Sequence, residues 1–300
     1  MPMVYALSAT KHQKKNKLKK FIDFHALYHM LSIKIKLPTI IFIAFFTLSF
    51  HLCIAQQDVK PNFIFKTIVI DAGHGGKDPG AHGDYSFEKN VTLAIALKVQ
   101  ALAKKKIVHI KTIMTRSTDE FIELNQRSEI ANKNYANLFI SIHCNSSPEG
   151  TKKIANKEKG VLLLVYGYHR KEEQMEALRE NASIYIEKDY QAKYAGYTEN
   201  DPSNLIILNT MMAKYRKQSI LFGELLNQQF TDNNGRGSRG VKEQGVLVLA
   251  HSGMPAVLIE TGYINNPDEE KYLNSEDGQN EIAASIVNAI IAYRDKISTK

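Results

Sequence analysis

Short apolar runs alternate with longer amphipathic stretches along most of this chain. Runs typical of buried strands cover residues 67–71, 107–115, 138–143, 160–166, 246–249 and 256–260. Stretches with helical spacing cover residues 87–103, 121–134, 219–230 and 277–294. Strands that alternate with helices are typical of an α/β domain with a largely parallel sheet. We therefore predict a single α/β domain over residues 66–294, with a mostly parallel central sheet of about six strands flanked by helices.

One segment, residues 167–217, breaks this alternation. It contains a charged stretch at 171–174 and a tyrosine-rich stretch at 185–197. Because neither stretch continues the strand–helix rhythm, we predict a helical insertion into the domain. The sequence contains no internal repeat and no sign of a second domain of comparable size.

Residues 1–55 form a leader that differs from the rest of the chain. Lysines precede an apolar stretch from residue 37 to 54, and the small residue Ala55 precedes two glutamines. This arrangement is typical of a secretory signal peptide cleaved after Ala55, and residues 56–65 then form a short linker. We therefore expect an exported, periplasmic protein.

The leader also leaves alternatives open. An apolar stretch of about 18 residues approaches the length that spans a bilayer, so the protein could instead keep it as an uncleaved membrane anchor. Met30 gives a better-proportioned signal peptide than Met1, which makes the first 29 residues a start-site artefact or, with an anchor, a cytoplasmic tail. Cleavage would leave Cys144 as the only cysteine, so the exported protein would form no internal disulfide.

The positive charge of the chain is concentrated in this leader. The formal net charge is +8, but residues 1–55 hold eight lysines and one acid, which leaves 31 basic and 30 acidic residues for the rest. A nearly neutral mature protein gives no indication of binding nucleic acid, and we predict no such partner. The 44% hydrophobic content is sufficient for the core of one large domain.

His74 and Glu88 lie at the first predicted strand-to-helix connection. His74 follows strand 67–71 in a glycine-rich loop, whose backbone can approach a ligand closely. Glu88 lies at the start of the next helix, for which Ser86 is the expected N-cap. Each residue alone also has an ordinary explanation, as an incidental loop histidine and as an acid that complements the helix dipole.

His143 and Glu260 each close an apolar run. A histidine at the carboxyl end of a strand lies where open α/β sheets bind ligands, and a carboxylate at the end of a buried strand is costly unless it is paired or belongs to a site. Together the four groups match a catalytic zinc site, in which two histidines and one carboxylate leave a fourth position for water. The second carboxylate can then serve as general base.

The motifs around these residues are IDAGHGGKDPGA at 70–81, EK at 88–89, SIHCN at 141–145 and PAVLIETGYINN at 255–266. With them the chain resembles the zinc-dependent N-acetylmuramoyl-L-alanine amidases, the type 3 cell-wall amidases, over nearly all of residues 66–294.

The resemblance implies both a metal site and a reaction. It implies Zn²⁺ bound by His74, Glu88 and His143, with Glu260 as the catalytic acid/base. It implies hydrolysis of the amide between the lactyl group of N-acetylmuramic acid and L-alanine of the peptidoglycan stem peptide, for cell-wall remodelling or daughter-cell separation. A zinc peptidase that cuts within the stem peptide and a catalytically silent wall-binding protein are the alternatives.

The resemblance also bears on the insertion. In some division amidases an inserted helix covers the zinc cleft until an activator protein displaces it. Residues 167–217 stand in the corresponding place, and we expect them to gate the site; the alternative is a solvated helical decoration. An activator protein would then be a partner beside peptidoglycan. The acids of the insertion that could reach a metal are Glu180, Glu187, Asp189 and Asp201.

Other candidates have weaker support. Cys144 should face away from His143 along a strand, so we predict core packing rather than a thiol nucleophile. Arg116 and Arg127 match arginines common in the family, and structural and substrate-anchoring roles are both open, as they are for Arg239. The histidines outside the matching positions, which we interpret as surface or loop residues, are His82, His109, His169 and His251.

Overall fold

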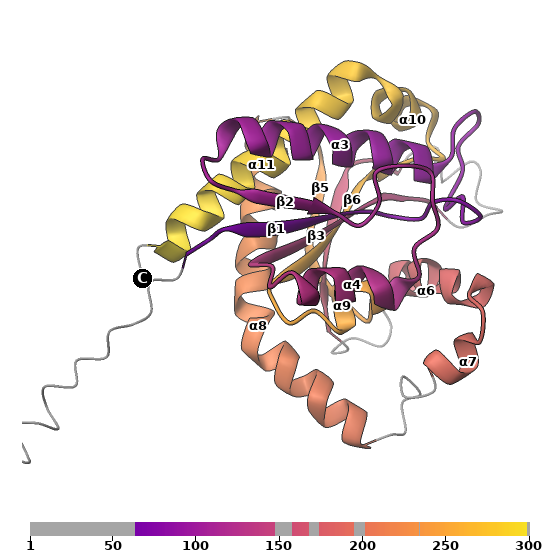
Figure 1. Cartoon of the computed structure of the whole chain (residues 1–300). Helices are drawn as coiled ribbons and strands as arrows, with labels where there is room; N and C mark the ends of the chain where they lie inside the picture. The colour runs from indigo at the N-terminus through magenta and orange to yellow at the C-terminus, as the bar shows by residue number, and fades with distance from the viewer. Residues whose placement is uncertain (1–63, 148–157, 168–173, 195–201, 234, 299–300) are drawn as a thin grey trace, which may run out of the picture. The chain divides into compact units, whose positions relative to one another are not determined.

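The computed structural model describes residues 64–298 except 148–157, 168–173, 195–201 and 234 (Figure 1). The predicted leader, its cleavage site and nearly all of the linker therefore lie outside the described residues. The part of the chain with a described fold belongs to one compact unit, Phe63–Lys300. Within that part, no helix is both long enough and apolar enough to cross a membrane.

A six-stranded sheet forms the centre of this unit, in the order β2-β1-β3-β6-β4-β5. Only the β4–β6 pair is antiparallel, which confirms the predicted α/β fold with a mostly parallel sheet. Every residue of β1, β3, β4 and β6 is buried, as expected for continuous apolar runs covered on both faces. The strands are β1 (Thr67–Ala72), β2 (Lys111–Met114), β3 (Leu138–Asn145), β4 (Val161–Tyr166), β5 (Ser238–Gln244) and β6 (Ala256–Tyr263).

Helices cover both faces of the sheet (Figure 1). The α3 face is covered by α3 (Glu88–Lys106), α10 (Pro267–Asn274), α11 (Glu276–Ser298) and the C-terminal part of α8 (Pro202–Gln228). The α4 face is covered by α4 (Leu124–Lys133), α9 (Leu247–Ala250) and α6 (Met175–Asn181). Each face has its own hydrophobic core, so the sheet is enclosed on both sides.

Strand alternation decides which face each chemical group reaches. In β3, Ile140 packs into the core of the α3 face and Phe139 into that of the α4 face. The alternation continues, so Cys144 is buried on the α3 face and His143 lies on the α4 face. The predicted core packing of Cys144 is thereby confirmed. Glu260 of β6 is in register with His143, which places both side chains on the same face.

One predicted strand was wrong and another was too long. The run at 246–249 forms the short helix α9, because four apolar residues do not distinguish a strand from a buried helical turn. The sixth strand is instead β5, a half-buried edge strand whose polar sequence does not resemble a core strand. The predicted strand 107–115 is reduced to β2, since Ile107 ends α3.

The predicted helical insertion has a defined structure close to the sheet. After β4 it forms α6, a short 3-10 helix η2 (Ala182–Ile186) and α7 (Tyr190–Lys193). It then joins α8, which continues without interruption past the predicted boundary at 217, and the π-helix η4 (Gln229–Asn233) follows. The insertion is therefore continuous with a helix of the core.

Candidate metal centre

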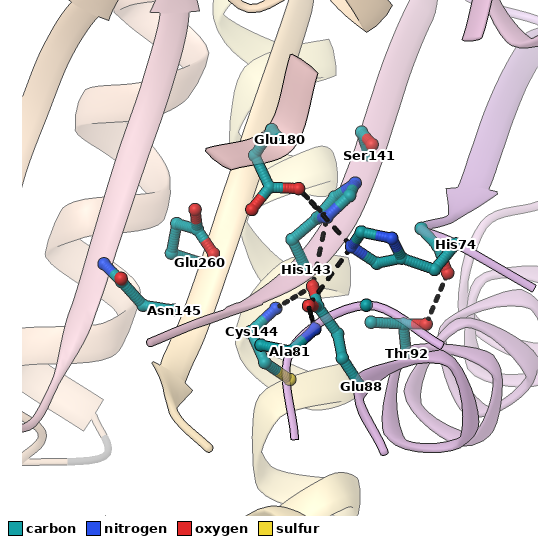
Figure 2. A network of polar contacts seen from close by, with 12 residues as sticks. His74, Ala81, Glu88, Thr92, Ser141, His143, Cys144, Asn145, Glu180 and Glu260 are labelled. Carbon is teal, nitrogen blue, oxygen red and sulfur yellow. Dashed lines mark hydrogen bonds and ion pairs between the residues drawn. The ribbon is translucent and has the colours of Figure 1, made fainter. Parts of the chain in front are cut away.

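Four buried side chains converge beside the end of β3 (Figure 2). His74, Glu88, His143 and Glu180 each offer one ligand atom, and these atoms all lie within 4.8 Å of one another. The loop after β1, the start of α3 and β3 supply the three residues for which zinc ligation was predicted. Glu180 comes from α6, inside the insertion.

The four side chains lie close together, but two of their polar atoms lack a hydrogen bond of good geometry. His74 Nε2 lies 3.1 Å from Glu88 Oε2 and 3.4 Å from Glu180 Oε2. His143 Nδ1 lies 3.1 Å from Glu88 Oε1 and 2.7 Å from Glu180 Oε2. Yet neither His74 Nε2 nor Glu180 Oε2 has a contact with hydrogen-bond geometry among the described residues, a costly condition for buried atoms that a cation beside them would relieve. Imidazole nitrogens with carboxylate oxygens suit zinc, so the residues present fit a metal ion.

Opposite charges stabilise one another within the cluster. Burial opposes protonation of the His143 imidazole, but the carboxylate of Glu180 outweighs it and raises the pKa of His143 to about 9. Burial also opposes ionisation of Glu88, but the charge of His74 together with hydrogen bonds from His143 and His74 outweighs it and lowers the pKa of Glu88 to about 2. A metal ion that binds here must therefore displace protons from the imidazoles.

Asp78 and two glycines fix the position of His74. Asp78 Oδ2 lies 2.8 Å from His74 Nδ1, which turns Nε2 toward the cluster. Gly73 lies against the ring of His143, and Gly80, whose φ is +67°, lies against His74 and Glu88. A Cβ atom at either glycine would collide with the site, so the loop requires glycine at these positions.

Arg116 and Arg127 hold the backbone of the same loop. Arg116 is 1% exposed and donates to the carbonyl oxygens of Ala72 (2.9 Å) and Gly73 (2.7 Å). Arg127 donates to the carbonyl oxygen of His74 at 2.8 Å. These contacts assign the two arginines a structural role, one of the two left open by the sequence.

Glu88 is held by two backbone amides. The N–H groups of Ala81 and Cys144 donate to its two carboxylate oxygens, each at 2.8 Å. The expected N-cap was wrong, because Phe87 occupies that position and no side chain caps the helix. Ser86 instead donates its hydroxyl to a carboxylate from α10.

Glu260 lies beside the cluster and is fully buried (Figure 2). Its Oε1 accepts a hydrogen bond from Arg179 at 2.7 Å, while its Oε2 finds no hydrogen-bond partner in the part of the chain that the structure describes. Burial raises the pKa of Glu260 to about 8, although Arg179 works in the opposite direction. A carboxyl with a pKa near neutrality can both accept and return a proton, as a general acid/base must.

The insertion contacts the site through two consecutive residues of α6. Arg179 binds Glu260 and also donates to Asn145 Oδ1 at 2.7 Å, and Glu180 joins the cluster of ligand atoms. Neither Arg179 nor Asn145 was among the residues predicted from the sequence. The only available signals were the adjacency of Arg179 to an acid of the insertion and the place of Asn145 in the SIHCN motif.

The other acids of the insertion lie elsewhere. Glu187 accepts hydrogen bonds from the backbone N–H of Leu124, at the start of α4, and from the hydroxyl of Tyr194. Asp189 precedes α7 with a left-handed backbone, φ 57°. Asp201 lies outside the described residues.

The remaining candidates are also away from the cluster. Arg239 pairs with Glu158 at 2.7 Å. His82, His109 and His251 take no part in the group of ligand atoms, and His169 lies outside the described residues.

Comparisons with known proteins place this site in a family. A family model described as N-acetylmuramoyl-L-alanine amidase matches residues 68–292. The N-acetylmuramoyl-L-alanine amidase AmiA of Salmonella typhimurium is 31% identical over 76% of this chain and 76% of its own length. AmiC of Escherichia coli is 32% identical over 75% of this chain. This chain spans about half the length of AmiC and of an AmiB relative from Haemophilus influenzae, 52% in each case.

A solved structure has the same fold. The catalytic domain of CwlV, an N-acetylmuramoyl-L-alanine amidase from Bacillus (Paenibacillus) polymyxa var. colistinus, has a TM-score of 0.51 and 30% sequence identity. The match covers 77% of this chain and 98% of that one. Since the family model extends from β1 to α11 and includes every predicted ligand, the chain belongs to the N-acetylmuramoyl-L-alanine amidase family, hydrolases that act on peptidoglycan.

Proposed function

We propose that this chain hydrolyses the amide between the lactyl group of N-acetylmuramic acid and L-alanine of the stem peptide, with zinc held by His74, Glu88 and His143. The observation that carries the proposal is the convergence of these three side chains beside Glu260, at the carboxyl ends of β1 and β3 (Figure 2). Cell-wall remodelling or the separation of daughter cells is the process in which such cleavage would serve.

Glu260 is the residue to which we assign proton transfer. Zinc, when bound, would polarise the attacked carbonyl and lower the pKa of a water molecule. Glu260 takes a proton from the attacking water and returns it to the nitrogen of the departing L-alanine. Its burial supports this role, because the raised pKa lets it hold the proton between the two steps.

Mass spectrometry of purified peptidoglycan digested by the protein, with and without a chelator, tests the proposed reaction. We expect stem peptides with a free L-alanine amine, and their release should stop when the chelator is present. Fragments cut within the stem would instead indicate a zinc peptidase. The silent wall-binding alternative predicts no fragments even from a variant in which the insertion no longer reaches the site.

We further infer that α6 gates this site. Glu180 places a carboxylate oxygen among the predicted ligands, in the position that substrate or water needs in a zinc enzyme. Its neighbour Arg179 binds the proposed general base. Since Arg179 and Glu180 occupy the site, substrate could reach it only after α6 moves. An activator protein that binds the insertion is the partner that would move this helix.

We also propose that the protein is exported. The leader pattern over residues 1–55 favours secretion, and a peptidoglycan substrate lies outside the cytoplasm. Sequencing the N-terminus of the protein isolated from the cell envelope distinguishes a cleaved leader from an uncleaved one. Cleavage after Ala55 predicts Gln56 as the first residue, whereas an uncleaved membrane anchor would leave the leader in place.

A further inference from the structure

Asn145 combines burial, a charged partner and an unsatisfied donor at the edge of the site. It ends β3, two residues after His143, and is 2% exposed. Its Oδ1 accepts hydrogen bonds from Arg179 and from the backbone N–H of Ser146, both at 2.7 Å. Its Nδ2 is buried and finds no hydrogen-bond partner among the described residues. An orphaned buried donor costs about 1–3 kcal/mol, which suggests that a ligand supplies its partner.

One guanidinium connects this asparagine to the proposed general base. Two terminal nitrogens of Arg179 donate, one to Asn145 Oδ1 and the other to Glu260 Oε1, each at 2.7 Å. Because the nitrogens of a guanidinium form a rigid planar fork, the two acceptor oxygens must face the same small space. When α6 leaves, both acceptors lose the N–H donors of Arg179 together, and Asn145 Oδ1 keeps only that of Ser146.

The proposed substrate carries an N–H donor at the bond to be cut. The scissile amide nitrogen has one N–H, and it must present its lone pair to the proton on Glu260 as the bond to the lactyl carbonyl breaks. An acceptor that holds the N–H would fix the rotation of this nitrogen. Asn145 Oδ1 is an acceptor close to Glu260, since one guanidinium bonds both.

We propose that Asn145 is a substrate-binding residue whose Oδ1 accepts a hydrogen bond from the N–H of the scissile amide, while its Nδ2 donates to a carbonyl oxygen of the stem peptide. Asn145 exchanges no proton, since Glu260 delivers the proton that turns the leaving nitrogen into an amine. In the closed form, Arg179 takes the place of the substrate N–H. This assignment rests on the proposed amidase reaction and adds a contact on the leaving-group side.

The test uses the full chain with Arg179→Ala and Glu180→Ala, so that changes at Asn145 do not act through Arg179. Asn145→Ala in this parent should lower kcat/KM for a soluble N-acetylmuramoyl tripeptide by about 100-fold, mainly through kcat. Zinc content should stay unchanged. Asn145→Asp, which keeps an acceptor oxygen, should recover part of the loss.

Asn265 offers a matched control at the same end of the sheet. Its side-chain amide bonds both the N–H and the carbonyl of Ser147, at 3.1 and 3.0 Å. Asn265→Ala should lower the melting temperature and leave kcat nearly unchanged. Binding of the product tripeptide with its free L-alanine amine, measured by calorimetry, should weaken in Asn145→Ala and not in Asn265→Ala.

Three results would overturn the assignment. An unchanged kcat/KM together with unchanged product binding in Asn145→Ala would remove Asn145 from substrate binding. A loss of activity in Asn145→Ala that is matched by a loss of zinc, or by a fall in melting temperature like that of Asn265→Ala, would instead indicate a structural role for Asn145. A parent that releases no L-alanine amine from any substrate would instead refute the amidase reaction and this assignment with it.

Discussion

At the scale of single residues, the site depends on buried charges that have specific partners. Glu260 is fully buried and has Arg179 as its charged partner on one oxygen. Asp71, deeper under the site, is fully buried and has three partners. We propose a catalytic role for the first residue and a stabilising role for the second, and substitutions should separate the two.

Glu260→Gln should abolish turnover and keep the metal. The amide of glutamine cannot take a proton from water, and the loss of a general base costs about 10²–10⁴ in rate. Zinc should stay bound because Glu260 is not among the four groups that share the ligand cluster. Zinc content by elemental analysis and release of L-alanine amines measure the two effects. His74→Ala is the comparison, in which zinc and activity should both be lost. A near-normal rate in Glu260→Gln would rule out Glu260 as the general base.

Asp71→Asn should destabilise the fold in a pH-dependent manner. Burial opposes ionisation of Asp71, but Arg127 at 2.8 Å and two hydroxyl donors at 2.6 Å lower its pKa below the usual value. The asparagine leaves Arg127 buried without its countercharge, which costs about 3–5 kcal/mol.

The sign of the pH dependence follows from the lowered pKa. The stabilisation by Asp71 is complete above the unfolded-state pKa of about 3.9 and is lost as the pH falls through the lower folded-state pKa. Urea unfolding at pH 7 and pH 3 should therefore show a larger gap between wild type and variant at pH 7. A gap of the same size at both pH values would contradict the assignment.

At the scale of elements, α6 is a core-packed helix and also a cover for the site. Ala177 is buried in the core of the α4 face, and its N–H donates to Gln244 at the end of β5. Leu178, on the same helix, is 66% exposed. Asn181 also bonds the backbone of Gly245 and Leu247, at 2.9 and 2.8 Å, whereas Arg179 and Glu180 reach the site.

Glu180→Ala should raise the basal rate of peptidoglycan hydrolysis without any added partner. The substitution removes a carboxylate from the ligand cluster in the closed form, and each 1.4 kcal/mol lost by that form raises the open population about tenfold. Leu178→Ala is a control on the solvent side of the same helix and should leave the rate unchanged. A basal rate in Glu180→Ala equal to that of wild type would count against gating.

At the scale of the whole molecule, the site joins segments that are distant in sequence. The ligand cluster includes groups from the loop after β1, from α3, from β3 and from the insertion. A metal ion bound to them would connect both faces of the sheet to one centre. Metal binding should then contribute to the stability of the entire fold, since a preformed site does not exist in the unfolded chain.

Zinc removal should lower the melting temperature. With free zinc at about 100 times its dissociation constant, binding adds about 2.7 kcal/mol to the free energy of unfolding. For a fold of this size, that corresponds to roughly 5–10 °C. Scanning calorimetry with and without a chelator measures the change, and His74→Ala should be insensitive to the chelator. Equal melting temperatures of wild type with and without the chelator would contradict a metal-linked fold.

The sequence by itself indicated the sheet core and picked out the three residues that we propose as ligands, which the structure brings together. Continuous apolar runs made β1, β3, β4 and β6 recognisable, and alternation along β3 placed His143 and Cys144 on opposite faces. These features depend on residue type and on close neighbours in the chain.

Only the tertiary structure decided what lies beside the predicted ligands. Arg179 and Glu260 are 81 residues apart in sequence, and no local pattern indicates that they touch. The choice of Glu180 among four acids of the insertion, and of β5 over the run at 246–249, likewise depends on which surfaces meet after folding. Long-range packing sets these contacts, whereas hydrophobic periodicity records only whether each side chain faces the core.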